Sequence, residues 1–404
     1  MLMTRIISTD DHVVEPPNLW MERLPSRYKD IGPRVVRENI AMTWVGGRPK
    51  WTPDESGFPC DFWVYEDLKK PIMAEGASIG IETEGAGQGI TFDQMRPGFY
   101  DPLERVKDMD INGIEASMCF PNFMPRFCGQ AFLEAKDHEL GLLCVKAYND
   151  WMADVWAGPS EGRLIHISII PLWDPFLAAE EIRRNAARGG RAITFSELPT
   201  KLGLPSIHSN DRHWDPVFQA CTETDTTICM HIGSSSNRVE TSLDAPLIVG
   251  TILNVTNVMA SMCDWLFSGV FERYPKLKVA YSEGNIGWIP YILERADRVW
   301  AEQPHLYDHA LVPHTPSDYY RSNMFGCYIS DQFGLDSVNA VCEDTITFET
   351  DYPHGDTTWP NSVQVADKEL AHLTPVQREK ILRGNAIRML SLESLHPRFT
   401  PTAS

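Results

Sequence analysis

The chain has 404 residues, of which 43% are hydrophobic, and its 36 basic and 55 acidic residues give a formal net charge of -19. This length allows either one large α/β barrel or two domains of ordinary size. The acidic balance argues against a nucleic-acid partner, because proteins that bind phosphate backbones concentrate lysine and arginine.

Short β-branched or apolar runs recur along the chain, separated by stretches with helical spacing. The predicted strands are Thr4–Thr9, Ile114–Phe120, Leu164–Ile170, Arg191–Phe195, Thr226–Met230, Leu277–Ser282, Met324–Ser330 and Asp344–Thr350. Helices are predicted near 101–112, 130–157, 174–188, 213–224, 244–273, 286–303, 334–342 and 361–389. Eight alternating strands predict the α/β class and a (β/α)8 TIM barrel. An open doubly wound sheet is the alternative, but no glycine-rich phosphate loop follows the first strand.

Residues 20–100 interrupt this alternation with glycine, proline and aromatic residues. We interpret the chain, 1–404, as a single domain that carries 20–100 as an insertion after the first strand. A loop at this place in a barrel emerges on the catalytic face. The insertion is therefore either an irregular cover stabilised by aromatic side chains, or a substrate lid or dimer arm, and a homodimer is compatible with it.

The nine cysteines include no close pairing motif, which is typical of a reducing compartment. The N-terminus reaches charged residues too early for a signal peptide, and no apolar run approaches the roughly 18 residues of a membrane span. We therefore expect a cytoplasmic protein with no membrane partner.

Ionisable residues follow the predicted strands at their carboxyl ends, where a barrel collects its reactive groups. Asp10 and His12 end the first strand, two residues apart, so that both side chains face the same side. Glu197, His231, Glu283 and Asp351 follow later strands, with His354 close behind. Each alone is more often a helix cap or a hydrogen-bonded core residue. Burying them together is costly unless a cation compensates them, so the set predicts a divalent metal site.

Several motifs resemble the amidohydrolase-related family, the second amidohydrolase group, which includes enzymes similar to aminocarboxymuconate semialdehyde decarboxylase. The resemblance spans almost the whole chain. It rests on Ser8–His12 (STDDH) with Glu15–Pro17 (EPP), Met230–Ser234 (MHIGS), Ser282–Pro290 (SEGNIGWIP), Thr350–His354 (TDYPH) and Ile381–Ala386 (ILRGNA).

The resemblance implies a metal held by Asp10, His12, His231 and Asp351, with an open position for water or a substrate oxygen. Asp351 would act as general base toward that water, and His354 would orient a carboxylate or donate a proton. A structural hydrogen bond is an equally good account of His354.

The chain departs from the decarboxylases of this family after the sixth strand, where Glu283 replaces their usual histidine. Glu283 can relay protons or bind a second metal, and Glu197 lies where some amidohydrolases place a bridging carboxylate. Asp10, His12, Glu197, His231, Glu283 and Asp351 can then hold one ion or two, of zinc or of iron or manganese. His208 and His213 are further candidate substrate contacts, although solvent-facing loop histidines are the simpler interpretation.

The leading hypothesis is a metal-dependent hydrolase of a carbonyl compound, such as an amide, ester, lactone or β-keto compound, with decarboxylation as a neighbouring reaction. The alternative is a non-haem dinuclear iron or manganese monooxygenase. A catalytically silent barrel is the third class, and a serine hydrolase is disfavoured because no GxSxG motif is present. The aromatic content of the insertion suggests an apolar or aromatic small-molecule substrate.

Overall fold

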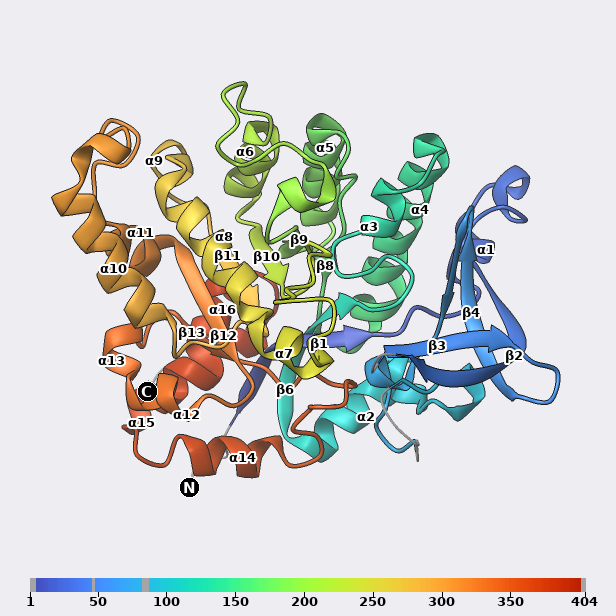
Figure 1. Cartoon of the computed structure of the whole chain (residues 1–404). Helices are drawn as coiled ribbons and strands as arrows, with labels where there is room; N and C mark the ends of the chain where they lie inside the picture. Colours follow the sequence, from blue (N-terminus) through green and yellow to red (C-terminus); the bar gives the residue numbers. More distant parts are fainter. Residues whose placement is uncertain (1–4, 46–47, 82–86, 401–404) are drawn as a thin grey trace.

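The computed structural model describes residues 5–45, 48–81 and 87–400. Parallel strands form its centre (Figure 1). In one sheet β6 (Ile114–Pro121) lies between β1 (Ile6–Val13) and β7 (Leu164–Ile165). The second sheet runs in order through β8 (Ile167–Ser168), β9 (Ala192–Thr194), β10 (Thr227–His231), β11 (Val279–Ser282), β12 (Met324–Tyr328) and β13 (Ile346–Phe348). Strands that alternate with helices in this way confirm the α/β class.

The two parallel sheets adjoin at both ends. Only His166 separates β7 from β8. At the other end, the amide of Asp351 donates to the carbonyl of Asp10 at 3.0 Å, and the amide of His12 donates to the carbonyl of Tyr352 at 2.7 Å. These bonds join the segment that follows β13 directly to β1.

Each predicted strand overlaps an observed one. The run predicted as a single strand over Leu164–Ile170 is divided at His166 into β7 and β8. The first predicted strand starts at Thr4, which lies outside the described residues.

Helices separate the strands, and several begin as their sequences indicate. Asp101 and Asp174 cap α2 (Pro102–Asn112) and α5 (Pro175–Ala186), each accepting two backbone N–H groups ahead of a proline in the first turn. The other helices on this path are α3 (Gln130–Leu133), α4 (His138–Trp151), α6 (Asp215–Thr224), α7 (Leu247–Leu253), α8 (Val255–Phe267), α9 (Val270–Arg273), α10 (Ile289–Glu302), α11 (Pro316–Asn323), α12 (Gln332–Asp336), α13 (Val338–Val341), α14 (Ser362–Glu369), α15 (Pro375–Glu379) and α16 (Asn385–Leu390). The sequence prediction missed α11.

The segment between β1 and α2 is more regular than the sequence suggested. It begins with α1 (Leu19–Arg23) and contains an antiparallel sheet in the order β3 (Arg48–Pro53), β2 (Arg34–Val45), β4 (Phe58–Tyr65) and β5 (Leu68–Pro71). The expectation of an irregular cover is therefore wrong, because the segment contains four strands paired in antiparallel register. Figure 1 shows this sheet beside α1 and α4.

Aromatic packing ties the inserted sheet to the rest of the fold. Trp63 of β4 is 1% exposed and meets Trp20 of α1 edge-on, with ring centroids 5.3 Å apart. The Trp20 indole N–H donates to the carbonyl of Cys144 in α4 at 3.0 Å. Both tryptophans belong to the large apolar cluster that includes the helices packed around the parallel strands.

A second apolar cluster joins residues of several parallel strands to the last helical segments of the chain. Its members include Ile7, Met118, Ile167, Phe325 and Leu390. All nine cysteines are free. One helical stretch among the described residues, Leu247–Phe267, passes a length and composition test for a membrane span, which is weak evidence because core helices pass it too.

Candidate metal centre

A β-bulge in β1 aims the first pair of candidate ligands. Between Ser8 and Asp11 the strand carries one more residue than its partner β6 has between Ser117 and Cys119. Bulges of this kind bend a strand and redirect its side chains, and they are frequent beside active sites. Asp10 and His12 are both completely buried and lie close to His231 at the end of β10.

Four side chains from distant parts of the chain meet here. His12 Nε2 lies 3.2 Å from Asp351 Oδ1 and 3.1 Å from His231 Nε2. His231 Nε2 in turn lies 3.3 Å from Asp10 Oδ2. The structure thus brings together all four residues that the family resemblance implies as metal ligands.

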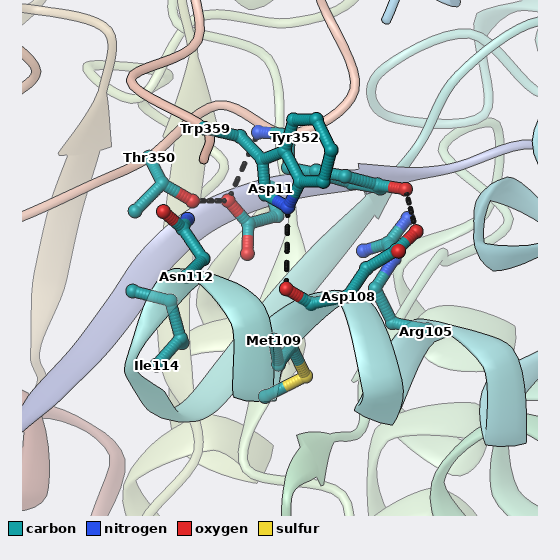
Figure 2. A pocket seen from close by; sticks show the side chains of 9 residues that line it. All are labelled: Asp11, Arg105, Asp108, Met109, Asn112, Ile114, Thr350, Tyr352 and Trp359. Carbon is teal, nitrogen blue, oxygen red and sulfur yellow. Dashed lines mark hydrogen bonds between the residues drawn. The ribbon is translucent and has the colours of Figure 1, made fainter. Parts of the chain in front are cut away.

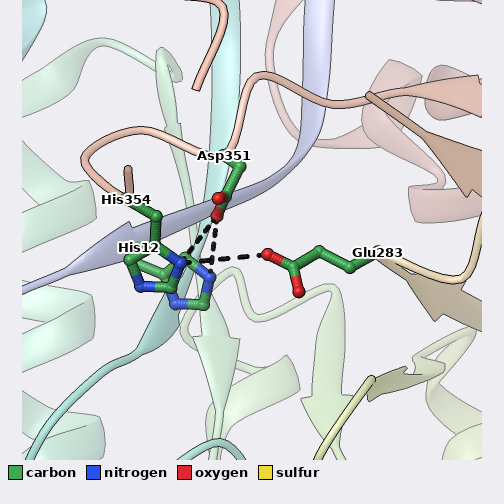
Figure 3. A group of neighbouring side chains, drawn as sticks. All are labelled: His12, Glu283, Asp351 and His354. Carbon is green, nitrogen blue, oxygen red and sulfur yellow. Dashed lines mark ion pairs between the residues drawn. The ribbon is translucent and has the colours of Figure 1, made fainter. Parts of the chain in front are cut away.

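Glu283 and His354 border this group. His354 Nδ1 lies 3.0 Å from Asp351 Oδ1 and 3.8 Å from Glu283 Oε1, as Figure 3 shows. Two overlapping sets of potential ligand atoms result, which share His12: Asp10, His12 and His231 in one, and His12, Glu283, Asp351 and His354 in the other.

The histidine pair has the electronic arrangement of a metal site. His231 Nδ1 lies 2.7 Å from the carbonyl oxygen of Ile232, so its N–H is used there and Nε2 keeps a lone pair. That lone pair faces His12 Nε2 at 3.1 Å. Such a contact is attractive only when a proton or a cation lies between the two nitrogens.

Unpaired carboxylate oxygens point to the same conclusion. Among the described residues, both oxygens of Asp10 and Oδ2 of Asp351 are buried without a hydrogen-bond partner, and Oδ1 of Asp351 meets the ring nitrogens of His12 and His354. Buried polar atoms are almost always paired, and an orphaned pair at one place suggests an absent ion. Oxygen and imidazole nitrogen donors suit zinc, manganese or iron, so the residues present fit a divalent metal.

Burial controls the protonation of the ligand set. It raises the pKa of Asp10 well above its ordinary range, and Glu349 and Glu283 raise it further. Burial also raises the pKa of Asp351 and lowers the pKa values of His12 and His231. The imidazoles are therefore held neutral, the form that binds metals, and the carboxylates need a positive charge to ionise.

The two flanking residues behave differently. Burial alone would raise the pKa of Glu283, but His231 and His354 lower it to about 2. Burial alone would lower the pKa of His354, but Asp351 and Glu283 raise it to about 10. His354 Nε2 lies 3.3 Å from Asn122 Oδ1, so both ring nitrogens have a partner.

Backbone strain marks the same location. Glu283 and Asp351 have φ values of 53° and 51°, in the left-handed region that non-glycine residues rarely adopt. Each such residue costs on the order of 1 kcal/mol or more, and strain of this kind concentrates at functional sites. Both side chains are aimed into the cluster by this turn at the end of their strands.

Sequence reasoning missed two residues of the site, Glu349 and Phe127. Glu349 accepts hydrogen bonds from the amide of Glu283 at 3.0 Å and from the thiol of Cys327 at 2.7 Å, and burial raises its pKa to about 8. The sequence signal that could have identified Glu349 was its position two residues before Asp351, since residues two apart in a strand face the same side. Phe127 stacks on His231 with centroids 4.1 Å apart, and no sequence pattern announces that contact.

Three predicted site residues lie apart from both sets of ligand atoms. Glu197 accepts hydrogen bonds from the amide of Gly233 and the hydroxyl of Ser235 and so supports the loop after β10. His208 pairs with Asp264 at the surface. His213 packs edge-on against Trp214. Metal binding by Glu197 and substrate binding by His208 and His213 stay predictions.

Fold and site together define an α/β enzyme whose candidate metal ligands sit at the carboxyl ends of parallel strands. The amidohydrolase family pattern matches residues 60–392. The chain therefore belongs to the amidohydrolase family, as the sequence motifs predicted.

Known relatives match most of the chain. The 2-amino-3-carboxymuconate-6-semialdehyde decarboxylase of Dictyostelium discoideum is 26% identical over 319 residues, which cover 76% of this chain and 80% of that protein. An amidohydrolase structure from Mycobacterium avium subsp. paratuberculosis K-10 has a TM-score of 0.71 at 22% identity, covering 96% and 100% of the two chains. A dihydroxybenzoic acid decarboxylase of Polaromonas sp. JS666, with bound manganese and the inhibitor 2-nitroresorcinol, has a TM-score of 0.62 at 18% identity, covering 97% and 98%.

Proposed function

We propose that this protein is a metal-dependent decarboxylase that releases carbon dioxide from a small aromatic or β-keto carboxylate. The convergence of Asp10, His12, His231 and Asp351 carries the proposal, because their buried nitrogen lone pairs and carboxylate oxygens are the donors that a divalent cation takes. The choice of decarboxylation over hydrolysis is supported by the Dictyostelium relative and by the Polaromonas fold neighbour, both decarboxylases.

The fold in this proposal is a closed (β/α)8 barrel that carries the inserted sheet after β1. The ion is manganese, zinc or iron, with one per chain, held by Asp10, His12, His231 and Asp351. When bound, it supplies a positive charge that holds the substrate's oxygens and stabilises the negative charge that develops as carbon dioxide leaves. We further propose a small-molecule substrate as the partner, a cytoplasmic location and a homodimer.

The protein's own residues handle the proton. Cleavage of the carbon–carbon bond releases carbon dioxide and leaves an electron pair on the substrate carbon, which must take up one proton. His354 is placed to donate it, because Asp351 and Glu283 flank its Nδ1 and favour the protonated ring. Glu283 is 20% exposed, whereas Asp351 is fully buried, so Glu283 offers the route by which solvent returns the proton.

Hydrolysis of an amide, ester or lactone is the second candidate, because the unpaired Oδ2 of Asp351 can take a proton from an attacking water. The dinuclear oxygenase has less support. It drew on Glu283 and Glu197 as additional ligands; Glu283 lies in the cluster, but Glu197 lies outside both sets of ligand atoms and its Oε1 supports the loop after β10.

The test starts with protein purified without chelator. Elemental analysis is expected to give about one divalent ion per chain, and carbon dioxide release from a panel of hydroxybenzoates and β-keto acids is expected without oxygen. His231→Ala should abolish turnover, whereas the matched variant at the exposed His305, His305→Ala, should keep it. Full turnover after thorough metal removal would overturn the proposal, and oxygen consumption would favour the oxygenase.

A further inference from the structure

We propose that Asp11 is a positioning residue that sets the distance between the two ligand-bearing segments of the metal centre, β1 and the turn after β13. This inference rests on the proposed function and names a residue outside the ligand set. Asp11 is 2% exposed, and Figure 2 shows its side chain among residues of α2 and of the segment that follows β13.

The Asp11 carboxylate accepts hydrogen bonds from the segment after β13 and from β6. Its Oδ1 accepts from Thr350 Oγ1 at 2.5 Å and from the amide of Tyr352 at 3.1 Å. Its Oδ2 accepts from Ser117 Oγ of β6. Along the chain, Asp351 therefore lies between Thr350 and Tyr352, which both donate to the Asp11 carboxylate. Asp11 itself lies between Asp10 and His12.

A second set of bonds reinforces this bridge. Ser8 Oγ accepts the amide of Thr350 at 3.0 Å and lies 3.1 Å from Asp11 Oδ1. Arg105 of α2, which is 1% exposed, donates to the carbonyl of His12 at 2.5 Å. The ligands on β1 are thus fixed to α2 and to the turn after β13 by buried charged groups.

The site itself explains why such a bridge is needed. Asp351 has a left-handed backbone, its Oδ1 meets the ring nitrogens of His12 and His354, and its Oδ2 has no hydrogen-bond partner among the described residues. Its placement against His12 therefore depends on its neighbours in the chain. Groups behind the ligands that fix their orientation commonly change metal affinity by about 10- to 100-fold when they are removed.

The space around Asp11 is a small cavity of about 10 Å³, lined also by Asp108 and Trp359. A cavity of that size holds one water at most. The arrangement is therefore a packed support for the metal centre and offers no room for a ligand of its own.

The experiment compares three variants by manganese affinity, measured calorimetrically on metal-free protein, and by the midpoint of thermal unfolding without metal. Asp11→Asn keeps an acceptor oxygen, and Thr350→Val removes only the hydroxyl beside Asp351. Both are expected to weaken manganese binding by about tenfold or more. The matched control Ser117→Ala removes a bond to the same carboxylate from β6, which carries no ligand, and is expected to keep the manganese affinity of the unaltered protein.

The readouts separate the explanations. A merely structural role would lower the unfolding midpoint of all three variants and leave their manganese affinity unchanged, which would overturn the inference. If the unaltered protein binds no divalent metal, the proposed function fails instead. Thr350→Val keeps the test decisive should Asp11→Asn not fold.

Discussion

Replacing Asp10 by asparagine should have opposite effects on the protein with and without its metal. In the metal-free protein, Asp10 is fully buried, and both of its oxygens lack a hydrogen-bond partner among the described residues. Burial and nearby carboxylates raise its pKa. The unfolded chain therefore loses this proton at lower pH than the folded one, and stability falls as pH rises above about 4. Asp10→Asn removes this fall in stability with rising pH, because asparagine does not titrate.

The magnitude follows from satisfying one buried polar group, about 1–3 kcal/mol, because the asparagine amide can donate to His231 Nε2, which lies 3.3 Å from Asp10 Oδ2. An unfolding entropy of about 2.1 cal/mol/K per residue gives about 0.85 kcal/mol/K for the 404 residues. Metal-free Asp10→Asn should then melt about 1–4 °C higher at pH 8. With metal at 100 times the Kd of the unaltered protein, binding stabilises that protein by about 2.7 kcal/mol, and a hundredfold weaker Kd leaves the variant only about 0.4 kcal/mol.

The assay is thermal unfolding at pH 8 over a series of manganese concentrations, with a chelated sample as the zero point. The two curves of melting temperature against manganese should cross. A variant that melts lower than the unaltered protein in chelator, or that gains as much from manganese, would refute the assignment of Asp10 as an uncompensated ligand.

Three further outcomes are expected. For Glu197, whose pKa burial raises to about 7, the free energy of unfolding should fall between pH 4.5 and 7 by on the order of 3 kcal/mol, and Glu197→Gln should remove that fall in denaturant titrations. Trp63→Ala should destabilise by about 3–5 kcal/mol in a single unfolding transition; two separate transitions would show that the inserted sheet folds independently. Phe127→Ala removes the ring stacked on His231 and should lower kcat with little change in the melting temperature, whereas equal losses in both would contradict a role at the site.

The parallel strands were predictable because each is a short apolar run bounded by turns. The starts of α2 and α5 were predictable from their capping residues, Asp101 and Asp174. The inserted sheet was not predictable. The residues of β2 show no local periodicity, and they pair with β4, which is a separate segment of the chain. Antiparallel pairing depends on contacts across the sheet, which one sequence does not reveal.

The proximity of the candidate ligands was predictable for a similar reason. Asp10, His12, His231 and Asp351 lie at the carboxyl ends of parallel strands or just after them, and such ends meet in barrel folds. Glu197 also follows a strand, but its side chain turns to the loop after β10, where the amide of Gly233 and the hydroxyl of Ser235 donate to it. The role of Asp11 required coordinates, because it depends on which donors surround the opposite face of β1.

The left-handed conformations of Glu283 and Asp351 restrict how this enzyme can be engineered. Libraries that vary position 283 to change the chemistry should recover glycine, asparagine and aspartate readily, and β-branched residues only with a shifted backbone. Histidine, which tolerates this region better than most residues, is the informative replacement, since it would exchange the carboxylate for an imidazole without reshaping the turn.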